Sequence, residues 1–482
     1  MNGDYLDIKD TIEPPYGEWS EILSANLSML EGVNLLARQE IRSEVFVKAQ
    51  RYTAELVIRA LKCGIQIASI PNDDRPDSAV IMTGHQPIIY HSGLLIKEQL
   101  LVQAADNLSA TAVNVIIDTD AGDAGKVTWP VIRNGELAIQ QGSLVRGEGA
   151  LFIEQQVAAK PQLIELFGRI KGDLREAKLD KAALSVEQVE KLYLALAGEP
   201  ISVANSIVRR SITGNLPLEI PLSVISALPA VQRWLLAIVK DGARCAATYN
   251  QTLDAYRLSH KIKNGANPFP NMKIEGDTIE LPLWRIDRAG RYPIVLKGGE
   301  PFELANGETL APRGGIVTLL LRGYCSELFI HGLGGARYDR FVDEFALRYV
   351  GDSLPRFVVA SRTRHLFPEK VEEISQALEL KQHFKEIVSH TEKFLGQGLF
   401  SSEEEQGLLF RISERRELLG LLHAASSDAE RSVATKQLNE LNKGVKAALE
   451  QSSLYRRVHK HGLDERSLQL WSYREFPYFF WS

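Results

Sequence analysis

The 482-residue sequence has few cysteines, no strong excess of either charge and no long apolar run. Its three cysteines, Cys63, Cys245 and Cys325, lie far apart, so they support neither a disulfide framework nor a cysteine zinc site. The formal net charge of −5 argues against a general nucleic-acid binder, because such proteins normally carry a basic excess. No stretch approaches the ~18 apolar residues of a membrane span.

The first 19 residues are polar and acidic, whereas a secretory signal peptide needs a basic start and an apolar core. Scattered cysteines without a pairing pattern are typical of a reducing compartment. We therefore expect a cytoplasmic protein that binds small molecules and has neither nucleic acid nor a membrane as a partner.

Common catalytic motifs are also missing. The sequence has no G-x-S-x-G elbow, no Walker lysine loop, no H-E-x-x-H pair and no zinc-deaminase pattern, and no metal-ligand set is predicted. The dinucleotide motif G-x-G-x-x-G fails, because Arg337 stands where the third glycine would follow Gly332 and Gly334. NAD and FAD are therefore not expected.

Hydrophobic periodicity predicts an α/β protein of two to three packing units, at about 150 residues per domain. An apolar strand at 79–83, a turn, a helix at 93–108 and a second buried strand at 112–120 form a βαβ unit, which implies a parallel sheet. Residues 316–322, 327–351 and 356–361 again suggest strand, helix and strand.

These patterns divide the chain into four segments. They are an N-terminal helical segment packed on the core (1–75), an α/β core (76–370), a helical region (371–460) and an aromatic C-terminal segment docked on the core (461–482). The core segment carries insertions at about 160–310, with helices over 160–255 followed by short antiparallel strands.

The region from 371 onward keeps apolar residues at three-or-four spacing, with breaks at Gly396 and at Ser426–Ser427. A capping box, Ser402–Glu405, predicts the start of its second helix. Such a pattern favours a helical hairpin or an antiparallel coiled coil, which either packs on the core or pairs with another subunit as a homodimer.

The first candidate site is the turn after the strand at 79–83. Gly84 allows the backbone to approach a ligand closely, and His85 and Gln86 place hydrogen-bonding groups just past the end of the strand. The N-terminus of the following helix faces the same place, although a phosphate or carboxylate would also need His85, His91 or Lys97. Alternatively, these residues only make a turn, and Lys97 is a solvated helix residue.

Three acids, Asp118, Asp120 and Asp123, follow the next strand of the predicted sheet. Neighbouring parallel strands would place them beside the first turn, where they could hold an amine, a sugar hydroxyl or Mg²⁺. Aspartates are also ordinary turn and cap residues, so a purely structural role is equally open.

Two further clusters could bind anions. Gly332, Gly334 and Gly335 open a predicted helix, and His331 and Arg337 flank them; the alternative is a tight junction between strand and helix. Arg362 and Arg364 are two residues apart on a predicted strand, so they face one side and suit a carboxylate or phosphate. A surface ion-pair face is the alternative for these arginines.

Taken in order, three stretches resemble the bacillithiol-biosynthesis cysteine-adding enzyme family. They are T-G-H-Q-P at 83–87, similar to the family's T-G-Q-Q-P turn; F-I-H-G-L-G-G-A-R-Y at 329–338, similar to its Y-V-G-G-P-G-E-I-A-Y segment; and 357–374, similar to its strand leading into a coiled coil. Positions that agree are Thr83, Gly84, Gln86, Gly332, Gly334 and Tyr338, and Asp120 takes the place of a family acid. His85 replaces a glutamine, and Gly335 replaces an acid.

The resemblance implies a Rossmann-like core, inserted connecting elements and a C-terminal coiled coil used in dimerisation. It also implies a ligase, because in that family cysteine is joined through its carboxyl group to the amine of glucosaminyl-malate. A nucleotide site for ATP or ADP, with or without Mg²⁺, comes with the same resemblance.

Our leading hypothesis is an enzyme that forms an amide between an amino acid and an amino-sugar conjugate. Activation of the carboxylate creates negative charge, which His85, His91 and Lys97 would stabilise as cations, while Asp120 would orient the amine or act as base. The alternatives are a nucleotidyltransferase-like enzyme and a non-catalytic ligand-binding or assembly protein that works through its coiled coil.

Overall fold

The computed structural model describes residues 8–31, 36–68, 78–145, 156–214, 217–287, 289–460 and 463–481. The predicted boundary at 75–76 lies outside the described residues. The chain forms two compact units, described separately below. The first comprises Met1–Ile132, Ile139–Arg364 and Arg474–Ser482, and the second comprises Arg133–Ala138 and His365–Tyr473.

A six-stranded sheet organises the first unit, in the order β1-β12-β11-β2-β3-β6. Its strands are β1 (Ile8–Glu13), β2 (Val80–His85), β3 (Thr111–Ile116), β6 (Leu218–Pro221), β11 (Leu328–His331) and β12 (Phe357–Arg364). All are parallel except β1, which pairs antiparallel with β12 at the edge. The predicted mixed α/β fold with a mostly parallel sheet is therefore confirmed.

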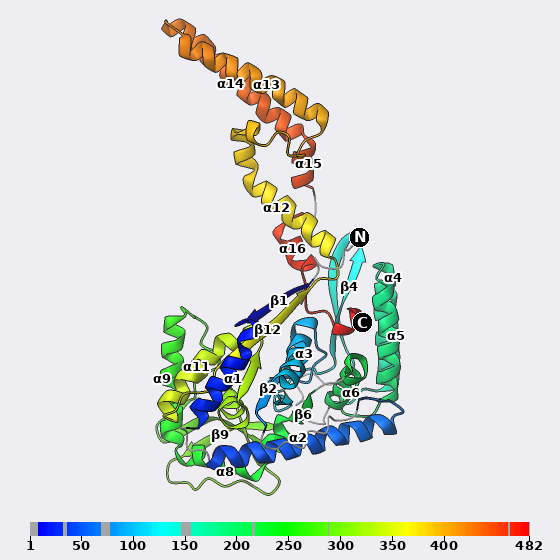
Figure 1. Ribbon diagram of the computed structural model, residues 1–482, viewed down its shortest axis with the longest axis vertical. Helices are drawn as coiled ribbons and strands as arrows, with labels where there is room; N and C mark the ends of the chain where they lie inside the picture. Colours follow the sequence, from blue (N-terminus) through cyan, green and yellow to red (C-terminus); the bar gives the residue numbers. More distant parts are fainter. Residues whose placement is uncertain are drawn as a thin grey trace. The chain divides into compact units, whose positions relative to one another are not determined.

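The strand order places a topological switch point in the middle of this sheet. Numbered along the chain, the five parallel strands lie in the order third, second, first, fourth, fifth, so the direction of winding reverses between β2 and β11. Side chains of β2 alternate between two cores: Ile81 packs beneath α1 (Trp19–Leu30) and α3 (Ser92–Asn107), and Met82 packs beneath α2 (Leu36–Lys62). The sheet is thus covered by helices on both faces (Figure 1).

The helices expected over 160–255 are confirmed, but strand β6 lies between two of them. The helices are α4 (Lys160–Glu176), α5 (Asp180–Ala195), α6 (Ile201–Thr213), α7 (Leu222–Ser226), α8 (Pro229–Lys240) and α9 (Gly242–Ser259). Strand β6 was missed because it is a four-residue buried run between helices, and periodicity does not distinguish so short a run from a buried helix segment.

The predicted antiparallel insertion is confirmed as a separate small sheet. Its strands are β7 (Ile274–Glu275), β8 (Thr278–Ile286), β9 (Arg291–Lys297) and β10 (Thr309–Pro312), with β8 paired to each of the others. The helix α11 (Leu333–Tyr349) then follows β11, as expected from the pattern of 327–351.

Three local expectations were wrong or incomplete. Residues 316–322, expected as a strand, belong to α10 (Gly315–Leu320) and a π-helical turn, η2 (Leu321–Cys325), because a short, mostly apolar run has no period that separates strand from helix. Strand β1 was not predicted, since its polar sequence lacks alternation and main-chain pairing with β12 forms it. The hairpin of β4 (Lys126–Arg133) and β5 (Glu136–Ser143) was also missed.

The aromatic C-terminal residues from Arg474 onward belong to the first unit, whereas the part of the predicted 461–482 segment before Arg474 belongs to the second. Phe476 and Phe479 are each 1% exposed. The turn η4 (Tyr478–Trp481) packs against α5, and the backbone N–H of Tyr478 donates to the carbonyl of Tyr90 at 2.9 Å. Burial of these rings removes the apolar surface that an exposed tail would present.

The second unit is helical. It contains α12 (Pro368–Ser389), η3 (Thr391–Lys393), α13 (Ser402–Ala424), α14 (Asp428–Gln451), α15 (Ser453–Val458) and α16 (Glu465–Trp471). Helices α13 and α14 pack along each other as a hairpin (Figure 1). Each begins with a capping box, Ser401–Glu404 and Ser427–Glu430, so the box predicted at Ser402–Glu405 is placed one residue too late.

Candidate functional site

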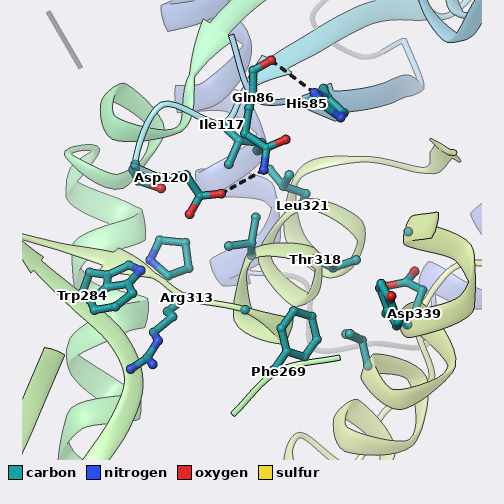
Figure 2. Close-up of a pocket in the computed structure, with 18 of the residues that line it drawn as sticks. His85, Gln86, Ile117, Asp120, Phe269, Trp284, Arg313, Thr318, Leu321 and Asp339 are labelled. Atoms are coloured by element: carbon teal, nitrogen blue, oxygen red, sulfur yellow. Dashed lines mark hydrogen bonds between the residues drawn. The ribbon is translucent and has the colours of Figure 1, made fainter. Parts of the chain in front are cut away.

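A cavity of about 470 Å³ lies in the first unit, at the carboxyl edge of β2, β3 and β11 (Figure 2). Its walls come from the turns after these strands, from α9, α10 and α11, and from the small antiparallel sheet. The lining residues are Gly84, His85, Gln86, Ile117, Thr119, Asp120, Tyr249, Phe269, Pro270, Met272, Trp284, Arg291, Pro312, Arg313, Gly314, Val317, Thr318, Leu321, Phe329, His331, Gly335, Tyr338, Asp339 and Val342.

The position of this cavity follows from the strand order. Strands β2 and β11 are neighbours on either side of the switch point, and open α/β sheets bind ligands in the crevice outside such strand ends. Gly84 lies close to β3, because a Cβ atom there would be 3.1 Å from the carbonyl oxygen of Val115. Because β2 and β11 are parallel, the glycine turns that follow them lie at the same edge of the sheet.

Asp120 belongs to a polar chain at the mouth of the cavity. Gln86 donates from Nε2 to its Oδ2 at 3.0 Å (Figure 2). Arg291 of β9 donates from Nη1 to Oδ1 of Asp120 at 2.8 Å. The same Arg291 nitrogen donates to the carbonyl of Thr119 at 3.0 Å. Each carboxylate oxygen therefore has one described donor and retains capacity to accept another.

The two histidines of the first turn carry no positive charge near neutral pH. Burial, reinforced by the nearby Lys97 ammonium, lowers the pKa of His85 to about 3. Burial also lowers the pKa of His91 to about 4, with Arg474 and Lys97 adding to the effect. The expectation that both act as cations is wrong, because desolvation in the fold outweighs their intrinsic basicity.

His91 and Thr83 have structural contacts instead. His91 is the N-cap of α3 and accepts from the backbone N–H of Gly93 at 3.1 Å through Nδ1. Thr83 donates from its hydroxyl to the carbonyl of Ile330 at 2.8 Å, which joins β2 to β11. Neither side chain lines the cavity.

Lys97 is a buried cation, not a solvated helix residue. Its side chain donates from Nζ to the carbonyl of Gly84 at 3.0 Å and is 4% exposed. Burial lowers the pKa of Lys97 to about 8, although the neighbouring Glu98 opposes the shift. Lys97 therefore stabilises the main chain of the first turn through this hydrogen bond, and its side chain does not line the cavity.

The three predicted acids do not converge. Asp118 accepts from the backbone N–H of Ser223 at 2.8 Å, and Asp123 accepts from the N–H of Gly125 at 2.9 Å and the hydroxyl of Ser143 at 2.7 Å. Asp120 alone of the three lines the cavity. Within the described ranges, no three His, Cys, Asp or Glu side chains form a group that could hold a metal ion.

The second turn contributes one of its three predicted glycines, Gly335, and two side chains. His331 and Tyr338 line the cavity, whereas Gly332, Gly334 and Arg337 do not. Gly332 is the N-cap residue of α11.

Asp339, which the sequence did not single out, is 2% exposed and hydrogen-bonds to His331 Nε2 through Oδ2 at 2.8 Å. Its carboxylate also pairs with Arg322. Burial on its own would raise the pKa of Asp339, but the charges and hydrogen bonds of His331 and Arg322 outweigh burial and lower it.

The predicted arginine pair lies elsewhere. Arg362 pairs with Asp10 of β1 at 2.7 Å, and the guanidinium carbon of Arg364 lies 5.2 Å from the ring centre of Trp481. Neither lines the cavity. For Arg362, the ion-pair alternative is the one that the structure bears out.

Sequence reasoning also missed the part of the site supplied by the insertion. The guanidinium carbons of Arg291 and Arg313 lie 4.6 Å and 4.2 Å from the ring centre of Trp284, and Arg313 also donates to Glu280 at 2.6 Å. These residues follow no motif, and their only signal is their place in a predicted hairpin inserted into an α/β core.

No protein-family model matches the chain, and a search of curated proteins also returns no match. Among the described helices, none combines the length and apolar character needed to cross a membrane. The geometry of the cavity therefore carries the functional argument.

Proposed function

We propose that the protein is a carbon–nitrogen ligase that joins an amino acid to the amine of an amino-sugar conjugate in this cavity. The supporting observation is the placement of Asp120, after β3, and of His331 and Tyr338, at the junction of β11 and α11, around one cavity at the switch point. By the resemblance to the cysteine-adding family, the amino acid is cysteine and the acceptor resembles glucosaminyl-malate. The pathway would be biosynthesis of a low-molecular-weight thiol.

In this proposal Asp120 orients the acceptor amine. Its two oxygens are held by Gln86 and Arg291 and can still accept from an ammonium or amine. Arg291 and Arg313, in place of His85 and His91, stabilise the negative charge that forms when the carboxylate is activated. Their guanidinium groups stay charged when partly buried and suit carboxylate and phosphate groups. ATP would activate the carboxyl group, with Mg²⁺ bound through its phosphates.

The strand order supports a Rossmann-like core. We also propose that α13 and α14 form a coiled coil that dimerises the protein, in the cytoplasm. The support is four large apolar side chains more than half exposed on this hairpin: Leu409, Phe410, Leu421 and Val433.

One observation favours a second candidate, a non-catalytic ligand-binding or assembly protein. His85 is neutral, and Lys97 is occupied by the carbonyl of Gly84, so the first turn supplies less positive charge than activation of a carboxylate calls for. A nucleotidyltransferase-like enzyme is a further alternative, with Arg291 and Arg313 as its phosphate-binding groups.

The test is turnover with ATP, cysteine and glucosaminyl-malate, followed by mass spectrometry of the amide and by measurement of ADP or AMP. Asp120→Asn should lower turnover by about 10²–10⁴-fold while leaving ATP binding within a factor of a few, because it removes a charge that faces the amine. Asp106→Asn, at an exposed position of α3, is the matched control. Calorimetric binding of ATP or the acids without any amide or nucleotide product would instead establish the ligand-binding alternative.

A further inference from the structure

We propose that His331 is the proton acceptor of the cavity and that Asp339 and Arg322 are its positioning residues. The inference rests on the proposed function for the identity of the substrate, which is an amine that must lose a proton as the amide forms. It assigns the roles of base and orienting group to different side chains: His331 takes the proton, and Asp120 orients the amine.

The orientation of the His331 ring is set by a buried chain of charges. Nε2 lies 2.8 Å from Oδ2 of Asp339, and both residues are buried. Arg322 pairs with the same carboxylate, and it also contacts Asp343 at 2.9 Å. Because Arg322 and Asp339 are each 2% exposed, the carboxylate is held in place and fixes one nitrogen of the imidazole.

The other nitrogen of His331, Nδ1, remains available on the cavity side. Within the described part of the chain, no group hydrogen-bonds to Nδ1. It lies beside Gly335, which also lines the cavity, and a Cβ atom at that position would be 2.9 Å from Nδ1. Glycine at 335 therefore leaves room for the imidazole, and a side chain there would crowd Nδ1.

These contacts determine which tautomer can work as a base. An ionised carboxylate only accepts, so the neutral ring keeps its hydrogen on Nε2, facing Asp339, and its lone pair on Nδ1. The charged groups that face the ring are Asp339 and Asp343 of α11 and Arg322 of η2, which sum to one negative charge. The carboxylate of Asp339 thus orients the ring so that Nδ1 is the atom that can accept a proton.

The proton balance of the step is simple. The amine nitrogen attacks the carbon of an acyl phosphate or acyl adenylate, and a C–N bond forms. The bond from carbon to the phosphate oxygen breaks, and the phosphate or AMP leaves with the electron pair. The surplus proton on nitrogen passes to Nδ1 of His331, and solvent later removes it.

The first test needs no substrate. In protein carrying ¹³C- and ¹⁵N-labelled histidine, NMR should show neutral His331 as the Nε2–H tautomer, with His331→Gln used to assign its signals. Gly335→Ala should displace these signals, because its Cβ meets Nδ1. Gly334→Ala is the matched control on the same helical turn and should leave them unchanged, because nothing lies within 4 Å of a Cβ there. An Nδ1–H tautomer, or an unchanged signal in Gly335→Ala, would overturn the assignment.

The second test uses the turnover assay described above. His331→Gln should lose about 10²–10⁴-fold in turnover, the usual contribution of a general base, and should also lose the acid limb of the pH profile. Asp339→Asn, checked for folding by its melting temperature, should mix the tautomers and shift that limb. Retention of the wild-type profile in His331→Gln would refute the role of His331. Absence of turnover in the wild type would refute the ligase instead, and the NMR result would still decide how His331 is arranged.

Discussion

His85 shows how burial of a single side chain makes stability depend on pH. Its pKa is about 3 in the folded protein against 6.5 ordinarily, so between these values the unfolded chain binds a proton that the folded chain does not. Stability is therefore lost as the pH falls. From pH 7.5 to pH 5, His85 should account for about 2 kcal/mol of that loss.

Urea unfolding of wild type and His85→Gln at a series of pH values measures this contribution. As the pH falls, the free energy of unfolding should decrease less in His85→Gln than in the wild type. His423→Gln, which removes an exposed histidine, should behave like the wild type. Identical slopes for His85→Gln and the wild type would show that His85 is protonated normally in the folded state.

Lys97 makes stability depend on pH in the same direction as His85, but in a more alkaline range. Its pKa falls from 10.5 to about 8 on folding, so the folded protein holds the proton less tightly, and stability rises as the pH increases from about 8 to 10.5. Below pH 8, burial of the charged Lys97 lowers the free energy of unfolding by about 3 kcal/mol, since each pKa unit corresponds to about 1.4 kcal/mol. A buried side chain that costs this much is a good candidate for a role other than stability.

Lys97→Met should consequently raise the free energy of unfolding at pH 7 by about 2 kcal/mol, once about 1 kcal/mol is deducted for the lost hydrogen bond to Gly84. The gain should vanish above pH 10.5. Lys97→Ala is the contrasting variant and should gain less, because it leaves a cavity. A Lys97→Met protein that is less stable than wild type at pH 7 would contradict this account.

At the scale of elements, a buried ion triad joins α3, α6 and β6. Arg209 of α6 donates to Glu98 of α3 at 2.9 Å and pairs with Glu219 of β6, and all three side chains are at most 2% exposed. Removing the arginine alone would leave two carboxylates buried without their shared cation. Arg209→Met should therefore destabilise the protein by about 3–5 kcal/mol.

Denaturant unfolding of Arg209→Met tests this estimate. The control is Arg175→Met, which removes an exposed pair with Glu187 and should cost less than about 1 kcal/mol. Equal costs for the two variants would mean that the buried triad does not hold the elements together.

At the scale of the whole molecule, the prediction concerns association. In the first unit, Arg474 donates to the hydroxyl of Thr363 at 3.1 Å, so the chain leaves this unit and returns to it at neighbouring points. A short glycine–serine linker replacing 366–472 should therefore leave the first unit folded. Sedimentation velocity should give a dimer for the intact chain and a monomer for the shortened one.

A double substitution in the intact chain, Phe410→Glu with Leu421→Glu, should also produce monomers, because both side chains are exposed in the hairpin. If the intact chain already sediments as a monomer at micromolar concentration, the coiled-coil dimer fails while the proposal for the cavity is unaffected.

Much of the fold could be predicted from local pattern. Three parts of the chain show a clear hydrophobic period: the βαβ unit at β2, α3 and β3, the antiparallel insertion, and the helices after 371. Such a period arises because one face of each helix or strand is apolar. Strands β1 and β6 could not be predicted in this way. Their sequences are polar or very short, and pairing with β12 and β3 is what makes them strands.

The candidate site, like the fold, could be predicted only in part from local sequence patterns. The sequence by itself determined that each of the two glycine turns follows an apolar strand and opens a helix, because turn chemistry and hydrophobic periods are local properties. Only the tertiary structure decided the ionisation of His85 and Lys97, since desolvation depends on what the rest of the chain packs around them. It also decided that Arg291 reaches Asp120, a contact across 171 positions of sequence that no local pattern encodes.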